Sequence, residues 1–567
     1  MTITIETTPV DESGRLVHAE DATAQLCLAF ARLESALAAR GLGASSITRL
    51  RVRTCAPTDA SDLADLVEEW LDGTPVPVEL VDVAHLALPG MLVELRAQVP
   101  FTHSDSDSKD PIMNPTTTHL TALRALGTVL FPGDPGYDET CLPWNLAVRQ
   151  QPAAVAVPRS ADDVVELVRA ATATGLRIAP QSTGHAAAAL ADVGFHDVLL
   201  VRLHEFTGVT VDPAARVARV TGGTLWRDVI AATAPHGLTA LHGSAGDVAV
   251  AGYLLGGGLS FYGREHGLAA SAVRAIELVT ADGSLVRATA DQHPDLFWAL
   301  RGGGGNFGIV VAIEIELLEL AEVFAGMLLW DMERAPEVLA AWADWTTSLP
   351  ESVTTSVRLL RFPPLPELPP FLAGRSLVVV DGAVLEPDDR AAELLAPLRA
   401  LAPELDTFGR IPVTAMLDVH MDPPGPTPAV SDHALLAELP PEAVDALLAV
   451  AGPGVQIPLM FAELRHLGGA LARPQHAALS HLAGEYALFA VSPAPTPELV
   501  DLGHTITAGI VAALGPWTSG ASFLNFADRA VDPASAFAPA DWQRLQHVRD
   551  TYDPARVWVA AHAVGGR

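Results

Sequence analysis

The sequence predicts a multidomain protein of the α+β class. Its 567 residues exceed one ordinary hydrophobic core, which implies two to four domains. From about residue 120 to 510, short apolar segments typical of strands alternate with segments of helical periodicity. This pattern of strand-like and helix-like segments changes at about residues 100–120 and again near residue 320. With 49% hydrophobic and 18% charged residues, the chain has enough apolar side chains for several cores.

Charge and cysteine content exclude several classes of protein. The chain has 35 Lys and Arg against 67 Asp and Glu, a net charge of −32, whereas binders of nucleic acid or anionic membranes need a basic face. Cys27, Cys55 and Cys141 form no disulfide framework and no CxxC zinc pair, so we expect no metal. The N-terminus lacks the features of a secretory signal, and no apolar stretch is long enough for a membrane span. We therefore expect a cytoplasmic protein without nucleic-acid or membrane partners.

Residues 3–99 predict a compact unit, followed by a polar stretch without periodicity over 102–118 that predicts a linker or surface loop. The elements expected in the unit are a helix from Asp21 to the glycines at 41 and 43, a strand over 47–55, a helix over 60–71, and two strands over 78–83 and 91–99 joined around Pro89-Gly90.

Residues 120–320 combine short apolar strands with helices and glycine clusters. The expected elements are strands over 153–157, 198–201 and 217–220, helices over 161–175 and 225–236, and glycine clusters at 222–223, 256–258 and 302–305. Residues 325–510 contain longer strands and helices with proline-rich loops, and the irregular tail ends in a helix over 541–552.

Three motifs of small residues follow one another in the second region. They are Pro180-Gln-Ser-Thr-Gly-His185, the run from Gly243 to Gly258, and the run from Asp295 to Ile309. Small residues expose backbone N–H groups, which bind a pyrophosphate without basic side chains, although an ordinary strand-to-helix turn also uses Ser, Thr and Gly. The second motif is not the Rossmann fingerprint, because no strand–helix unit with a ribose-binding acid surrounds it.

The three motifs, in this order and spacing, resemble the FAD-linked oxidases of the vanillyl-alcohol-oxidase superfamily, and within it the berberine-bridge-enzyme-like group. The resemblance covers about residues 120–567, including Asn525-Phe526 and Tyr552-Asp553-Pro554 in the tail. It implies FAD as the cofactor and three regions: a PCMH-type FAD-binding domain over 136–320, an α/β substrate domain with an antiparallel sheet over 321–512, and a C-terminal segment over 513–567 that returns to the FAD domain.

The resemblance also implies the residues that hold the flavin. His185 occupies the position of the histidine that attaches covalently to the flavin 8α carbon; a hydrogen-bonded loop histidine is the alternative. Ala245 stands where some members have a second, cysteinyl link, so we expect none. Val248 matches a position whose small side chain leaves a path for O2, which favours an oxidase. The further FAD-binding residues implied are Gln181, Ser182, Thr183, Gly184, Ala186, Ser244, Asp247, Gly252, Gly256, Gly257, Gly258, Ile309, Asn525 and Phe526.

The proton acceptor of the family needs a replacement in this chain. The tail motif usually reads Asn-Tyr, and Phe526 has no proton to exchange. Alternation along the strand over 458–466 places Phe461, Glu463 and Arg465 on one face, so Glu463 is a candidate base and Arg465 a candidate group that orients an anion or carbonyl. An ordinary ion pair between them is the alternative. Tyr486 and His420 are further candidates, and Tyr137, Trp144 and Asn145 are candidates to line the ring.

The first unit resembles a second family, the Rid (reactive-intermediate deaminase) group. The matching stretches are Gln25–Gly41, Ile47–Cys55, Val81–Leu86 and Leu92–Leu95, which imply a Rid-like α+β domain over 1–100 and a linker over 101–135. Members hydrolyse enamines and imines, typically as trimers, with an arginine that binds a carboxylate. No arginine stands in 75–80, where the family has it. The domain is either a retired assembly module or an imine-handling unit for substrates without a carboxylate.

Together these observations predict an FAD-dependent oxidase of a small metabolite, in secondary metabolism. We expect hydride transfer to flavin N5 from a C–H next to an alcohol or amine, or an oxidative ring closure, with O2 reduced to H2O2. A dehydrogenase with another acceptor and a flavin-binding scaffold without turnover are the alternatives. The expected partners are a small substrate and O2, and association of copies through the Rid-like domain stays open.

Overall fold

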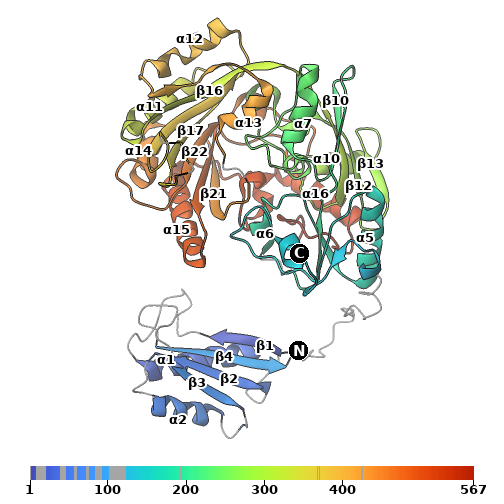
Figure 1. The fold of residues 1–567 in the computed structure, drawn as a ribbon, viewed down its shortest axis with the longest axis vertical. Coiled ribbons are helices and arrows are strands. Elements are labelled where there is room, and N and C mark those ends of the chain that lie inside the picture. Colours follow the sequence, from blue (N-terminus) through green and yellow to red (C-terminus); the bar gives the residue numbers. More distant parts are fainter. Residues whose placement is uncertain are drawn as a thin grey trace. The chain divides into compact units, whose positions relative to one another are not determined.

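The chain divides into two compact units, residues 1–111 and 112–567, in a computed structural model of the protein (Figure 1). The structure describes residues 2–7, 21–38, 46–55, 60–71, 74, 76–82, 92–100, 123–191, 194–366, 368–369, 371–422 and 425–566. The division falls inside the predicted linker over 101–135, most of which lies outside the described residues. The predicted boundaries at 320 and 512 stay predictions, because the larger unit is not divided further.

The N-terminal unit is a four-stranded sheet with two helices on one face (Figure 1). Its elements are β1 (Thr2–Thr7), α1 (Ala22–Ala38), β2 (Arg49–Thr54), α2 (Ala60–Leu71), β3 (Val78–Asp82) and β4 (Val93–Pro100), and the strand order is β1-β4-β2-β3. Asp21 caps α1, since its carboxylate accepts a hydrogen bond from the Ala24 amide at 2.9 Å. Leu26, Leu33, Leu50 and Val52 lie in the core between helices and sheet.

The two predicted strands over 78–83 and 91–99 are present as β3 and β4, and one further strand was not predicted. β3 and β4 do not pair with each other, because β2 lies between them: β3 is parallel to β2 through the α2 crossover, and β4 is antiparallel to β2. The strand β1 was missed, although Thr2–Thr7 alternates threonine and isoleucine as a strand does. The end of the first helix at the glycines 41 and 43 and the polar stretch over 102–118 lie outside the described residues.

The first half of the larger unit holds two sheets. One has the order β5-β6-β8-β7, with β6, β8 and β7 parallel; the other is antiparallel, with the order β13-β12-β14-β10-β9. Their strands are β5 (Val129–Leu130), β6 (Ala154–Ala156), β7 (Arg177–Gln181), β8 (Val198–Arg202), β9 (Val209–Asp212), β10 (Val217–Thr221), β12 (Val273–Val279), β13 (Leu285–Ala288) and β14 (Ile309–Glu316).

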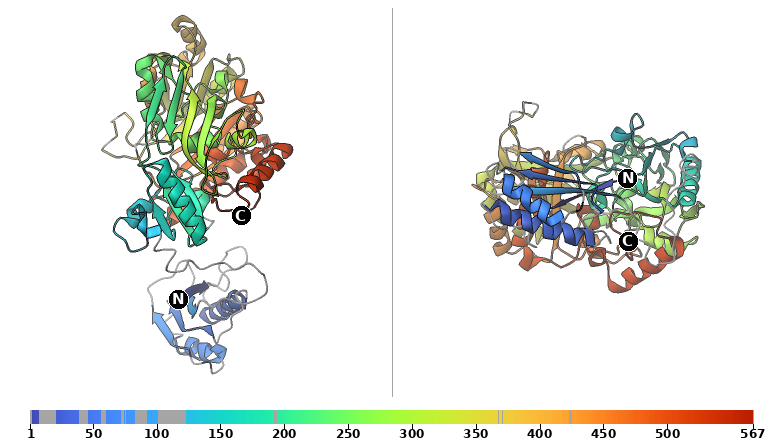
Figure 2. Two further views of the ribbon diagram at one scale, coloured as in Figure 1. Left: turned by 90° about the vertical axis from the view of Figure 1, so that its right-hand side faces the viewer. Right: turned by 90° about the horizontal axis from the view of Figure 1, so that it is seen from below.

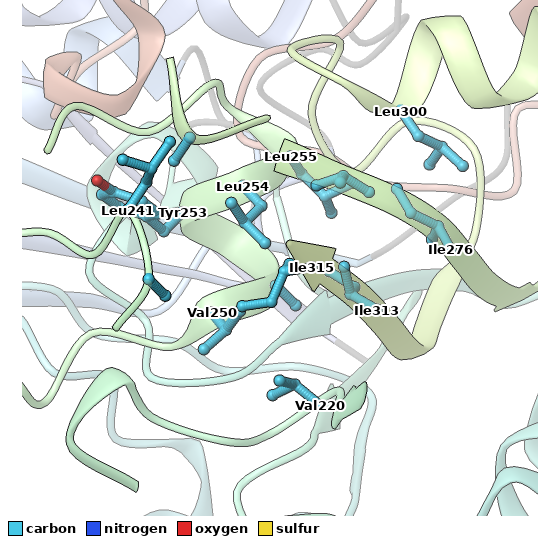
Figure 3. Packing of buried hydrophobic residues seen from close by; sticks show 14 of the residues in the cluster. Val220, Leu241, Val250, Tyr253, Leu254, Leu255, Ile276, Leu300, Ile313 and Ile315 are labelled. Atoms are coloured by element: carbon cyan, nitrogen blue, oxygen red, sulfur yellow. The ribbon is translucent and has the colours of Figure 1, made fainter. Parts of the chain in front are cut away.

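The helices of this half are short, and a small two-stranded ladder joins β11 (Leu238–Thr239) to β15 (Leu318–Glu319). The helices of this half are α4 (Tyr137–Cys141), α5 (Ala161–Thr174), α6 (Ala187–Ala191), α7 (Trp226–Thr233), α8 (Val250–Leu255), α9 (Gly263–His266) and α10 (Pro294–Leu300). Figure 3 shows Val250 and Leu254 of α8 packed against Ile313 and Ile315 of β14, which fixes the second motif on the antiparallel sheet.

The second half is built on one eight-stranded antiparallel sheet, which confirms the predicted sheet type. Its order is β19-β16-β18-β17-β22-β23-β21, and β20 also pairs with β16. The strands are β16 (Glu322–Asp331), β17 (Val353–Arg361), β18 (Ser376–Val384), β19 (Leu405–Asp406), β20 (Gly409–Pro412), β21 (Ala429–Leu436), β22 (Phe461–His466) and β23 (Tyr486–Pro493).

Helices cover one face of this sheet and leave the other face toward the first half of the larger unit (Figures 1 and 2). They are α11 (Ala335–Thr346), α12 (Asp388–Arg399), α14 (Pro441–Ala451) and α15 (Pro497–Ala513), with the short α13 (Met416–Val419) near the sheet's other side. Trp342, Leu395, Leu447 and Ile510 of these helices form one core with Leu464 of β22.

The C-terminal segment returns to the first half of the larger unit. After α16 (Pro539–Tyr552), Val557 and Val559 bond on either side of Ile178 in β7, each at 2.8 Å. The buried guanidinium of Arg549 donates to the Asn306 side chain at 3.0 Å, which ties α16 to the third motif. Among the described residues, we find no helix that is both long and apolar enough to cross a membrane.

Candidate active site

One cavity of about 480 Å³ brings the three sequence motifs together with β22, β23 and the C-terminal segment. The predicted residues that line it are Gln181, Ser182, Thr183, Gly184, His185, Ala186, Ser244, Ala245, Asp247, Val248, Gly252, Gly256, Glu463, Arg465, Asn525 and Phe526. Trp144 and Asn145 also line it, whereas Tyr137 is packed in a separate apolar cluster. Segments more than 300 residues apart in sequence therefore form one site.

Besides Tyr137, four predicted site residues lie outside the cavity lining. Gly257 and Gly258 turn the chain after α8, and a Cβ at Gly258, where φ is +74°, would lie 2.4 Å from the Tyr253 ring. Ile309 is buried behind the wall. Tyr486 lies on the opposite face of the sheet, where its hydroxyl pairs with that of Thr346 at 2.7 Å. A group on that face is separated from the cavity by the sheet, so we do not carry Tyr486 forward as a catalytic residue.

His185 is held in the cavity wall by neighbours from two loops. Its Nδ1 lies 2.7 Å from the Thr183 hydroxyl, and its ring stacks on Trp144 with centroids 4.3 Å apart. The Trp144 indole N–H donates to the Asp247 carboxylate at 2.8 Å, which fixes the stacking ring. Burial lowers the pKa of His185 to about 4, although Asp247 and Asp422 act in the opposite direction. The imidazole is thus neutral near pH 7 and keeps a nucleophilic lone pair.

The cavity has the features that a flavin dinucleotide needs. A Cβ at Gly252 or Gly305 would meet no other atom within 4 Å, so the backbone there is open to the cavity. Among the described residues, Gln181 Nε2 and the Tyr253 hydroxyl are buried polar atoms of the lining without a partner. Unpaired buried polar groups point to a ligand that pairs with them. We conclude that the residues present fit FAD.

Asn525 joins the C-terminal segment to the second motif. Its amide donates to the Tyr253 carbonyl at 3.0 Å, and its Oδ1 lies 1.5 Å from the place where a Cβ of residue 256 would be. Gly256 is therefore required by close approach of the Asn525 side chain. The contact holds Phe526, the next residue, against the cavity.

A chain of buried charged groups runs along the cavity-facing side of the sheet, because the register pairs Arg358 with Glu463 and places Asp381 on the same face. Glu463 accepts a hydrogen bond from Arg465 Nε at 2.6 Å, and Arg465 Nη2 lies 3.2 Å from His420 Nε2. Behind them, His420 Nδ1 lies 2.9 Å from Asp381, which also accepts from Arg358 at 2.7 Å. The ion pair of Glu463 and Arg465 is thus present, and Glu463 lies at the cavity as part of a larger network.

Asp381 is the ionised centre of this network. Burial alone would raise its pKa, but the neighbouring His420 and Arg358 side chains and the hydroxyl of Ser356 hold that pKa well below its usual value. Because the carboxylate is ionised, His420 Nδ1 carries the proton and donates to it, which leaves the Nε2 lone pair facing Arg465. Asp381 and Arg358 were missed by sequence reasoning, although an aspartate inside the apolar run of β18 is a signal for a buried, paired charge.

Phenylalanine rings form the apolar part of the cavity beside Glu463. Phe489 and Phe526 stack with centroids 4.7 Å apart, and Phe461 lies 6.0 Å from Phe489. The Arg465 guanidinium lies over the Phe526 ring at 5.5 Å. One side of this region is thus aromatic and the other carries the charged network.

Comparison with known proteins agrees with these features. Residues 152–289 match the family model described as an FAD binding domain, and residues 6–100 match the family Endoribonuclease L-PSP. (R)-6-hydroxynicotine oxidase of Paenarthrobacter nicotinovorans is 36% identical over 211 residues, 37% of this chain and 46% of that protein. Glucooligosaccharide oxidase of Sarocladium strictum is 33% identical over 214 residues, 37% of this chain and 43% of that protein. The chain thus spans less than half the length of these relatives.

Solved structures share the fold of the larger unit. Wild-type BBE-like 1 of Physcomitrella patens has a TM-score of 0.68 at 21% identity and covers 79% of this chain and 99% of its own. The 6-hydroxy-D-nicotine oxidase of Arthrobacter nicotinovorans has a TM-score of 0.66 at 24% identity and covers 76% of this chain and 95% of its own. The chain therefore carries an FAD binding domain of the PCMH type within a berberine-bridge-enzyme-like fold, together with an N-terminal domain of the Rid or Endoribonuclease L-PSP family.

Proposed function

We propose that the protein is an FAD-dependent oxidase of a small metabolite, oxidising a C–H bond next to an alcohol or amine and passing the electrons to O2. The observation that carries this proposal is that His185, the open glycine backbone and the buried carboxylate of Glu463 line one cavity. Relatives named as oxidases that match up to 37% of this chain support it.

In this proposal, bound FAD supplies the acceptor for the hydride of the substrate. Gln181, Gly252 and the backbone around Gly305 hold the cofactor, and His185 attaches to it covalently. A neutral imidazole, pressed flat against Trp144, suits attachment because the attacking nitrogen needs a free lone pair. Ala245 offers no second link. Val248 lines the cavity and, with its small side chain, leaves the path for O2 that an oxidase needs.

Glu463 accepts the O–H or N–H proton of the substrate. Its Oε1 is held by Arg465, which leaves Oε2 directed at the substrate. His420 accepts from the far end of the Arg465 guanidinium, and Asp381 fixes the tautomer of His420 that makes this bond. Arg465, His420 and Asp381 are therefore positioning residues for the base. A base on β22 also explains why no proton-accepting hydroxyl is needed at position 526, where this chain has phenylalanine.

The first experiment follows the flavin through denaturation. The purified full-length chain is expected to be yellow, and the colour is expected to stay with the protein after acid precipitation. The His185→Ala variant should release the colour into the supernatant. Colour in the supernatant of the unaltered protein would overturn the covalent attachment alone, and a protein that binds no added FAD would overturn the proposed function.

Turnover separates the oxidase from the alternatives. We expect alcohols or amines from a panel of small compounds to bleach the flavin without air, and air to restore the colour with formation of H2O2. Restoration by an artificial acceptor but not by O2 would instead indicate a dehydrogenase. Association of copies through the N-terminal unit stays a prediction, which light scattering after size-exclusion chromatography tests.

A further inference from the structure

One oxygen of Glu463 lacks a partner although the side chain is completely buried. Oε1 is 2.6 Å from Arg465 and 3.5 Å from His420, whereas Oε2 contacts no donor among the described residues. Glu463 is 0% exposed and lines the cavity. A buried carboxylate oxygen without a donor is costly, so this oxygen points to a ligand that brings an N–H or O–H group.

The charges of the cavity favour a cation over a neutral or anionic ligand. Among its described lining residues, Arg465 is the one arginine or lysine, whereas the lining carboxylates are Asp247, Asp422, Glu463 and Asp528. At the β22 end, Asp422 lies 4.0 Å from the His420 ring, and Arg465 already pairs with Glu463. Asp381 is neutralised from behind by Arg358. One negative charge therefore remains at this end of the cavity, and no free guanidinium is left for a substrate carboxylate.

The apolar wall of the cavity determines which chemical group the uncharged part of the ligand can carry. Phe461, Phe489 and Phe526, with Met460 beside them, present a continuous aromatic surface to the cavity. Aromatic rings stack on such a surface, while the hydroxyl groups of a sugar would lose their water without finding partners there. The charged end of the cavity at Glu463 and the aromatic wall formed by the three phenylalanines are thus separate.

We propose that the substrate is an arylalkylamine: a planar aromatic group whose side chain ends in a protonated primary or secondary amine. This inference rests on the proposed function. The ammonium donates to Glu463 Oε2 and the ring lies against Phe489 and Phe526.

The reaction balances with the groups available. The ammonium gives one proton to Glu463, and the neighbouring C–H bond breaks with its electron pair, which leaves as hydride to FAD. A C=N bond forms, and the product is an iminium ion. O2 is reduced by these two electrons and takes up the hydride's proton and the proton held on Glu463, which gives H2O2.

A binding series of three ligands with one carbon skeleton, and a sugar for comparison, tests the substrate class. The full-length flavoprotein is first reduced with dithionite, so that no turnover can occur, and is then titrated without air, near neutral pH, with 2-phenylethylamine, 2-phenylethanol, phenylacetate and cellobiose, using calorimetry and the change in the absorbance of the reduced flavin. We expect the amine to bind at least about tenfold more tightly than the alcohol, the value expected for a hydrogen bond to a charged group. Equal or tighter binding of the alcohol, phenylacetate or cellobiose would overturn the proposal.

Three variants identify the groups responsible. Glu463→Gln should remove the preference for the amine over the alcohol, whereas Phe489→Leu should weaken both ligands alike. Glu485→Gln, an exposed glutamate outside the cavity, is the matched control and should change neither. Retention of the amine preference in Glu463→Gln would refute the assignment. These affinities are separate from the proposed function, which fails if the protein holds no FAD or yields no H2O2, whatever the order of binding.

Discussion

Asp381→Asn is expected to destabilise the larger unit strongly. The substitution keeps the size of the side chain but leaves Arg358, only 2% exposed, without its counter-charge. Removing one partner of a buried ion pair costs about 3–5 kcal/mol. Because an asparagine oxygen still accepts from Arg358 or Ser356, we expect about 3 kcal/mol. Asp295→Asn is the control: its pair with Arg544 is exposed and is worth about 0–1 kcal/mol.

Urea unfolding followed by tryptophan fluorescence measures this effect, since Trp330 and Trp342 are buried in the core of the same sheet. The pH dependence gives a second readout. The folded pKa of Asp381 lies below its unfolded value of about 3.9, so its stabilisation is complete above that pH and is lost as the pH falls further. The difference between wild type and Asp381→Asn should shrink below about pH 4. Equal stabilities at pH 7, within about 0.5 kcal/mol, would refute the role of Asp381.

The remaining predictions concern the flavin and the base. Trp144→Leu should lower the fraction of covalent flavin, because His185 loses its stacking partner; acid precipitation measures this fraction, and an unchanged yield would contradict the positioning role. Glu463→Gln should retain FAD but slow flavin reduction about 10²–10⁴-fold in anaerobic stopped-flow, whereas an unchanged rate would exclude it as the base. Gly256→Ala should lower the thermal midpoint by displacing Asn525, and adding Asn525→Gly should restore part of it, unless the contact is unimportant.

Sequence reasoning succeeded where the relevant information is local. Alternation along β22 predicted that Glu463 and Arg465 share a face, and the structure places both in the cavity lining. The glycine motifs predicted open backbone, since small residues leave space whatever surrounds them. The identification of FAD as the cofactor came from the resemblance to known oxidases and not from the motifs alone.

It failed where the answer depends on strand pairing. Tyr486 pairs with His466, and paired residues share a face, so Tyr486 faces away from the cavity together with His466. Asp381 and Arg358 lie on the adjacent strands β18 and β17, and His420 follows them in a separate short helix region. No periodicity within one segment predicts that these three groups meet, because the register of the sheet sets their distances.

Phe526 in the tail motif and the buried Glu463 on β22 are best understood together. With phenylalanine in the tail motif, the C-terminal segment supplies an apolar ring stacked on Phe489, while the sheet supplies the charged groups. A ligand with one polar end then has a single favourable orientation, with that end toward Glu463. Because Arg465 bonds to Glu463 and also lies over Phe526, it links the polar and apolar sides. In the proposed mechanism, the same arrangement therefore sets both the position of the proton acceptor and the orientation of the bound substrate.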